Sequence, residues 1–163
     1  MSQPGSALFQ INQNPLLELN LQDISQAMAD RAPAEGLNSV TWLLRHLLDY
    51  RIETLAAVQS APFTPAPPEA KTLPELVAAI GAIQAALARA FDAVEDWTKV
   101  KHHPAFPAPM PLEQVVGIFL LHDAYHVGQL GVARRLLGLP GVIKESAMKN
   151  VDSPASTGLR WNF

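Results

Sequence analysis

The chain has 163 residues, of which 48% are hydrophobic and 17% are charged. This length and composition fit one globular domain with its own core. The net charge of −3 and the pI near 5.9 give no electrostatic reason to expect nucleic acid or an anionic membrane as a partner. Cysteine is absent, which excludes disulfides, thiolate metal sites and a cysteine nucleophile. The N-terminus lacks signal-peptide features and no uninterrupted apolar segment reaches membrane length, so we expect a cytoplasmic protein.

Four helices are predicted from apolar residues that recur at helical spacing. The first follows Asn14-Pro15, a capping residue with proline at the first helical position, and the second follows Asn38 or Ser39. A Thr72–Glu75 capping box opens the third, and Pro111 and Gly138 bracket the fourth. The expected helices span about residues 15–31, 40–58, 73–97 and 112–137.

The connections between these helices are long and rich in proline. Residues 60–71 and 99–111 have no apolar period, and no alternating run predicts a strand. Beyond Gly138 the chain shows little periodicity. The sequence therefore predicts an all-α four-helix bundle with long crossover loops and an irregular C-terminal tail.

The fourth helix carries two histidines one turn apart. His122 and His126 are four residues apart, so both rings can reach a single point, and they lie on the same side as Val115 and Phe119. Polar rings on an apolar stripe cost free energy unless their nitrogens are satisfied. A core histidine with one hydrogen bond is the alternative, but neutral imidazole is also the commonest metal ligand.

A helical bundle builds metal sites from side chains that project inward from facing helices, so the pair needs a third ligand. His46 is the candidate, because it is the remaining histidine on a predicted helix and flanks an apolar face. Three imidazoles leave coordination positions open, as in catalytic sites. His102 and His103 lie in a proline-rich loop, where we expect solvated side chains.

Two stretches resemble a known family: WLLRHLLDYR (Trp42–Arg51) and HDAYHVGQLGVARRLLG (His122–Gly138). They are similar to the DinB-like (DinB/YfiT) superfamily of metal-binding four-helix bundles, which is not the translesion polymerase that shares the name. The resemblance covers about residues 8–138, which form the core of the expected single domain of residues 1–163, and the tail at 139–163 lies outside it.

The same resemblance implies a site and a chemistry. It assigns a divalent metal to His46, His122 and His126, and zinc, nickel, iron(II) or cobalt suits three imidazoles. Similar proteins include S-transferases that use a small thiol and a thiol-dependent isomerase. Because this chain has no cysteine, such a reaction needs a low-molecular-weight thiol as cosubstrate and an electrophilic second substrate. Tyr50 and Gln129, together with Trp42, are candidates to line the substrate pocket.

Two other functions are compatible with the residues. A metal-dependent hydrolase is one, since His122 and His126 have zincin spacing, but Asp123 stands beside His122 where zincins have a glutamate general base. A non-catalytic metal- or ligand-binding module is the other. Finally, small residues such as Gly128 and Gly131 on the fourth helix predict close approach of another helix, either within the chain or in a homodimer.

Overall fold

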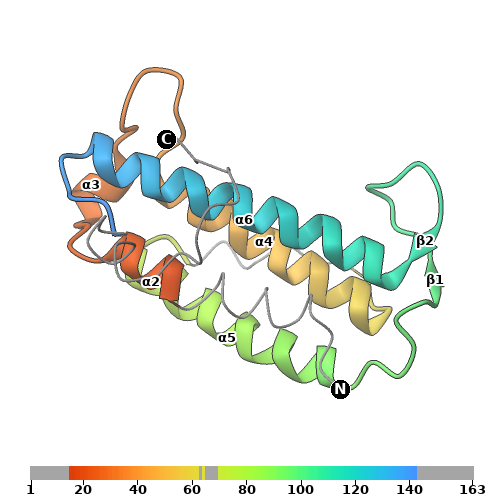
Figure 1. The fold of residues 1–163 in the computed structure, drawn as a ribbon. Helices are drawn as coiled ribbons and strands as arrows, with labels where there is room; N and C mark the ends of the chain where they lie inside the picture. Colours follow the sequence, from red (N-terminus) through yellow and green to blue (C-terminus); the bar gives the residue numbers. More distant parts are fainter. Residues whose placement is uncertain (1–14, 63, 65–69, 143–163) are drawn as a thin grey trace, which may run out of the picture.

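The structure, a computed structural model, describes residues 15–62, 64 and 70–142. Asn14 and residues 143–163 of the tail lie outside the described residues. Three long helices run side by side, with two short helices at one end of the bundle and a small hairpin at the other (Figure 1). The elements are α2 (Pro15–Leu21), α3 (Gln26–Asp30), α4 (Val40–Gln59), α5 (Leu73–Asp92), β1 (Val100–Lys101), β2 (Met110–Pro111) and α6 (Leu112–Leu136). The predicted all-α bundle is confirmed.

The first predicted helix is two helices, so the prediction of one continuous helix to about residue 31 was wrong. The break lies at Asp23, whose φ of 64° is left-handed and cannot continue a right-handed helix. Ser25 then caps α3, its side chain accepting a hydrogen bond from the Met28 amide. Across the bundle, the buried guanidinium of Arg134 on α6 donates to the carbonyls of Asn20 and Gln22. These bonds satisfy carbonyls that the end of α2 leaves without helical partners.

The capping residues read from the sequence place the starts of α4 and α5 correctly. Ser39 accepts a hydrogen bond from the Trp42 amide, and Thr72 and Glu75 form both halves of a capping box. The third helix ends earlier than predicted, at Asp92 rather than near Trp97. There the Ala93 amide is shared between the carbonyls of Arg89 and Ala90, which tightens and closes the last turn.

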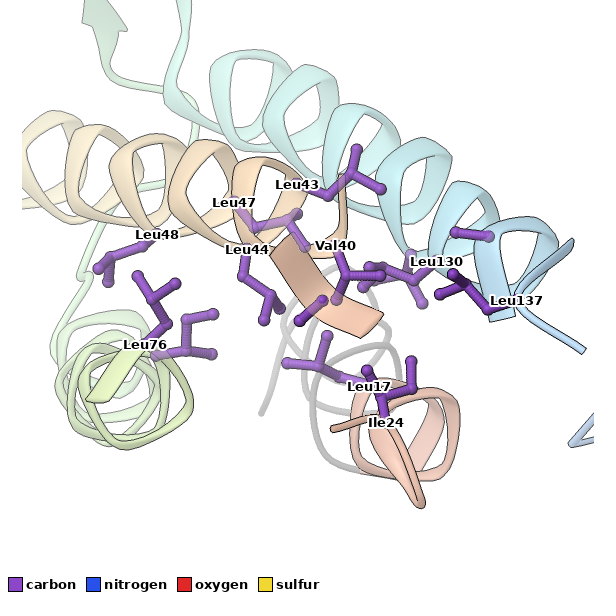
Figure 2. Close-up of a cluster of buried hydrophobic side chains, with 14 residues drawn as sticks. Leu17, Ile24, Val40, Leu43, Leu44, Leu47, Leu48, Leu76, Leu130 and Leu137 are labelled. Carbon is purple, nitrogen blue, oxygen red and sulfur yellow. The ribbon is translucent and has the colours of Figure 1, made fainter. Parts of the chain in front are cut away.

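The main core lies where α4 faces α2, α5 and α6 (Figure 2). Leucines of α4 such as Leu44 and Leu47 are fully buried between these neighbours. Burying each stabilises the fold by about 1.5–3 kcal/mol. Ile118 and Leu136 of α6 are apolar but 41% and 50% exposed. They lie on a different side of α6 from its buried valines and leucines.

Helix α5 qualifies the expectation that no segment reaches membrane length. Residues Leu73–Asp92 are long and apolar enough to cross a membrane by length and composition alone. Its apolar residues are leucine, isoleucine, valine and phenylalanine together with a run of alanines, which also favour helix. Within the bundle, Leu76, Ile80 and Leu87 of α5 are buried.

The connection between α5 and α6 forms the hairpin that the sequence did not predict. Val100 pairs with Pro111 and Lys101 with Met110 in antiparallel register. Two-residue strands are too short to leave an alternating pattern in a sequence. The hairpin sets the loop between β1 and β2 against the end of the bundle, where it contributes His103 and Phe106 to the surroundings of the site described next.

Candidate metal centre

The three predicted histidines come together between α4 and α6. His46 Nε2 lies 3.2 Å from His122 Nε2, which in turn lies 3.1 Å from His126 Nε2. One ring comes from α4, and the other two lie one turn apart on α6, where they meet edge to face. The same atom of each ring therefore faces a shared point, and the three residues can hold one ion.

The donor set fits a divalent metal in both spacing and protonation. Bonds of about 2.0–2.1 Å in a tetrahedral site place neighbouring nitrogens ~3.3 Å apart, close to the separations around His122. His126 Nδ1 donates to Gln129 Oε1 over 2.7 Å, so its Nε2 carries a lone pair. His122 has one Nε2 facing two neighbours, and a single proton cannot satisfy both contacts. An ion would satisfy all three nitrogens.

The surroundings keep His46 and His122 neutral, which is the form of imidazole that binds metal. Burial lowers the pKa of His122 to about 4, and the neighbouring His126 and His46 add to this effect. Burial and then the charge of His126 also lower the pKa of His46, while Asp49 acts in the opposite direction. Because a cation near other cations in a partly buried site is disfavoured, protons compete weakly for these nitrogens at neutral pH.

Aromatic rings cover the triad on the α4 side. Trp42 stacks on His46 with ring centroids 4.8 Å apart, and Tyr50 stacks on His122 at 3.7 Å. Tyr50 also meets Phe119 edge to face. The structure thus brings Trp42, Tyr50 and Gln129 against the three imidazoles. These aromatic contacts position His122, whose buried Nδ1 has no hydrogen-bond partner among the described residues.

A buried ion pair lies next to the triad, and sequence reasoning missed half of it. Arg51 on α4 donates from Nε and Nη2 to the two carboxylate oxygens of Asp123 on α6, at 2.8 and 3.2 Å. Arg51 is 1% exposed and Asp123 is 2% exposed. Helical spacing could have revealed the pair, since Arg51 falls in phase with the core residues Leu44 and Leu47, and a buried cation requires a buried anion.

His103 is buried and paired, contrary to the expectation that both loop histidines are solvated. Its Nε2 lies 3.5 Å from a Glu53 carboxylate oxygen, and its Nδ1 accepts a hydrogen bond from the Ala105 amide. Its ring packs against Phe106 and Phe119. His102 is exposed as expected. The histidine clusters that could bind metal in the described part of the chain do not include either residue.

The fold and the site define a helical bundle with a cluster of three histidines between two of its helices that could hold a metal ion. A family model described as the DinB superfamily matches residues 8–130, which is most of the chain. The chain therefore belongs to the DinB superfamily, as the sequence motifs predicted.

A solved structure with the same fold is known. The chain is similar to a protein described as the conserved protein of locus from Enterococcus faecalis, with a TM-score of 0.69 and 19% sequence identity. The likeness covers 84% of this chain and 96% of that one. At this identity it supports the fold alone. No curated protein matches the chain.

Proposed function

We propose that the protein is a metal-dependent transferase that activates a low-molecular-weight thiol, as an S-transferase or a thiol-dependent isomerase. The observation that supports this proposal is the convergence of His46, His122 and His126 through their Nε2 atoms. Three imidazole ligands leave open positions, the arrangement of catalytic rather than structural sites. The chain has no cysteine, so the thiol belongs to a cosubstrate.

The chain's own residues prepare the site for a thiol. A divalent ion there, with zinc, nickel, iron(II) and cobalt all compatible with imidazole ligands, would supply positive charge that lowers the pKa of the thiol towards neutrality. Gln129 holds the His126 ring with Nε2 unprotonated. Trp42 and Tyr50 cover His46 and His122 and limit the access of water. Limited water strengthens electrostatic interactions within the site.

The transfer itself is a substitution or addition at carbon. The thiol loses its proton to the buffer, and its sulfur forms a bond to an electrophilic carbon of the second substrate. With a chloro-aromatic substrate, the carbon–chlorine bond breaks and chloride leaves with the bonding electrons. With an isomerisable alkene, the same addition is followed by rotation and expulsion of the thiol, so the thiol is regenerated.

The surroundings of Asp123 argue against a metal-dependent hydrolase. A zincin-like mechanism needs the carboxylate beside the first histidine to act as general base on water. Here that carboxylate is buried and bound through both oxygens to Arg51. A buried carboxylate whose two oxygens already accept hydrogen bonds from Arg51 is poorly placed to bind and activate a water molecule. A non-catalytic metal-binding module shares the same triad and differs from the transferase only in turnover.

A thiol screen separates the transferase from the binding module. Metal-loaded protein is assayed with several small thiols and a chloro-dinitrobenzene electrophile, following the thioether product. We expect at least one thiol to react faster with wild type than with the His122→Ala variant. His102→Ala is the matched control, because His102 is exposed and distant in sequence from the triad. Equal rates in wild type and His122→Ala with every thiol would contradict the proposal and favour the binding module.

We also propose that the protein forms a homodimer through one face of α6. Five large apolar residues on this helix are between 41% and 71% exposed: Ile118, Leu121, Tyr125, Val132 and Leu136. Their spacings place them in one stripe, with Gly128 in its middle, as in the seam between two packed helices. Gly131 is not free for such a contact, since a Cβ there would lie 3.3 Å from the Asn20 side chain of α2.

The dimer is tested by mass in solution. Light scattering of the wild type at micromolar concentration should give twice the chain mass of 17.7 kDa. The Leu121→Lys variant places a charge at the most exposed position of the stripe and should give the mass of one chain. A monomeric wild type would contradict the dimer.

A further inference from the structure

A pocket lies beside the metal centre, on the side away from Tyr50. It has a volume of about 190 Å³ and is enclosed by the α3–α4 connection, α4 and α6. Most of its lining side chains are apolar, namely Pro33, Leu37, Leu43, Val132 and Ala133, and its polar side chains are Asn38 and Gln129. Figure 2 shows Leu43 reaching from α4 towards α6. The three histidines are not part of this lining.

Gln129 connects this pocket to the metal centre. Its Oε1 accepts the hydrogen bond from His126 Nδ1 at 2.7 Å, which leaves the two hydrogens of its Nε2 to donate elsewhere. Within the described part of the chain, no hydrogen bond from this nitrogen is found. Asn38 also lines the pocket, and the Gln129 amide is the polar group that adjoins the triad. A donor on the wall of a mostly apolar pocket favours a ligand with one acceptor beside an apolar group.

The size of the pocket limits the ligand. A cavity of about 150 Å³ in a protein core holds one benzene molecule, so about 190 Å³ accommodates a single six-membered ring or a short branched chain. The lining offers no charged side chain. An anionic group would therefore be desolvated there without a counter-charge, which is unfavourable.

We infer that this pocket is the subsite for an apolar group of the substrate, about the size of one six-membered ring, with a hydrogen-bond acceptor directed at the Gln129 amide. The inference rests on the proposed function, because it treats the pocket as part of the substrate site that adjoins the triad. Gln129 would then have two roles. It holds His126 in its metal-binding tautomer and binds the neighbouring acceptor of the substrate.

The test uses two neutral probes of nearly equal shape, acetophenone and ethylbenzene, of which only acetophenone carries an acceptor. Each is titrated into the full-length protein while methyl NMR signals are followed. We expect saturable shifts centred on Leu43 and Val132, with a dissociation constant on the order of 1 mM for ligands of this size. Acetophenone should bind about two- to tenfold more tightly than ethylbenzene, the effect of one hydrogen bond.

Two variants locate the site. Val132→Trp fills the pocket from an exposed position and should weaken both probes about tenfold. Ile118→Trp is the matched control, since Ile118 is exposed on the same helix and does not line the pocket. It should bind both probes like wild type. Gln129→Met should reduce acetophenone binding to the level of ethylbenzene and leave ethylbenzene unchanged.

The readout is independent of turnover, so its failure is distinguishable from failure of the proposed function. Shifts spread along the exposed stripe of α6, or equal weakening by Ile118→Trp, would overturn the subsite even if thiol transfer is observed. Saturable binding at Leu43 and Val132 that is lost in Val132→Trp would support the subsite even if no thiol reacts. Equal affinity of the two probes in wild type would overturn the role of Gln129.

Discussion

Helices α4 and α6 hold two polar clusters next to each other, one buried and one partly buried. The two clusters differ in whether the protein itself satisfies their polar groups. In the Arg51–Asp123 pair the opposite charges meet through two hydrogen bonds, although Arg51 Nη1 has no hydrogen-bond partner among the described residues. The histidine triad is incomplete, because three Nε2 atoms converge and no described residue neutralises or donates to all of them. The first cluster neutralises its own charges within the protein, whereas the second needs a ligand from outside to satisfy its converging nitrogens.

This difference separates a structural element from a binding site on one pair of helices. Removing one member of the Arg51–Asp123 pair leaves an uncompensated buried charge, so stability should depend on it strongly. Removing one member of the incomplete cluster removes a desolvated nitrogen, so metal binding should suffer while the metal-free fold changes little. The following experiments examine this contrast, beginning with the largest expected effect.

Arg51→Leu should lower the free energy of unfolding by about 3–5 kcal/mol, because Asp123 remains buried without its partner. The double variant with Asp123→Leu should regain most of the loss, since an apolar pair replaces a buried ion pair at little cost. Urea unfolding of metal-free protein measures both. If the double variant is as unstable as Arg51→Leu, the pair stabilises the fold by more than the mutual neutralisation of its two charges.

The three histidine variants should lose the metal but keep the fold. Elemental analysis should give about one divalent ion per wild-type chain and close to none for His46→Ala, His122→Ala or His126→Ala. His102→Ala should keep the ion. Removing the ion from wild type with a chelator should lower stability by about 2.7 kcal/mol when the free metal had been at 100 times its Kd. If all three variants retained wild-type metal, the triad would not be the site.

Gln129→Leu should weaken metal binding about 10- to 100-fold, because residues that orient a ligating imidazole have effects of this size. A competition titration against a coloured chelator measures the affinity. Gln114→Leu is the matched control, since Gln114 is an exposed glutamine on the same helix. Equal affinities of the two variants would mean that the hydrogen bond from His126 does not influence the metal.

Tyr50→Leu should have the smallest effect, because it removes a ring stack on His122 at 3.7 Å. Stacked aromatic pairs contribute about 0.5–1.5 kcal/mol beyond their buried area, so metal affinity should fall about two- to tenfold. Tyr50→Phe keeps the ring and should retain the affinity. The same competition titration distinguishes the two, and a loss in Tyr50→Phe would point to the phenol oxygen instead of the stack.

Features of this molecule that depend on residues close together in the sequence could be predicted from the sequence. Four-residue spacing on α6 and the flanking position of His46 predicted where three imidazoles would lie, and the caps at Ser39 and Thr72 predicted where two helices begin. The break between α2 and α3 was not readable, since it involves Arg134, which is 112 residues from Gln22. The burial of His103, which lies in the loop between β1 and β2, likewise depends on Glu53 of α4 and Phe119 of α6. Local sequence patterns predict where helices begin and how ligands are spaced. They do not predict which residues far apart in the sequence will contact each other.

The triad also joins parts of the chain that are far apart in sequence. His46 and His122 are 76 residues apart, and an ion bound by both would act as a reversible cross-link in a protein that has no cysteine. In the chain-entropy account of cross-links, closing a loop of this length restricts the unfolded chain by about 4.5 kcal/mol. Metal supply would then set how tightly α4 and α6 are tied together, in the way that redox conditions do for a disulfide-bonded protein.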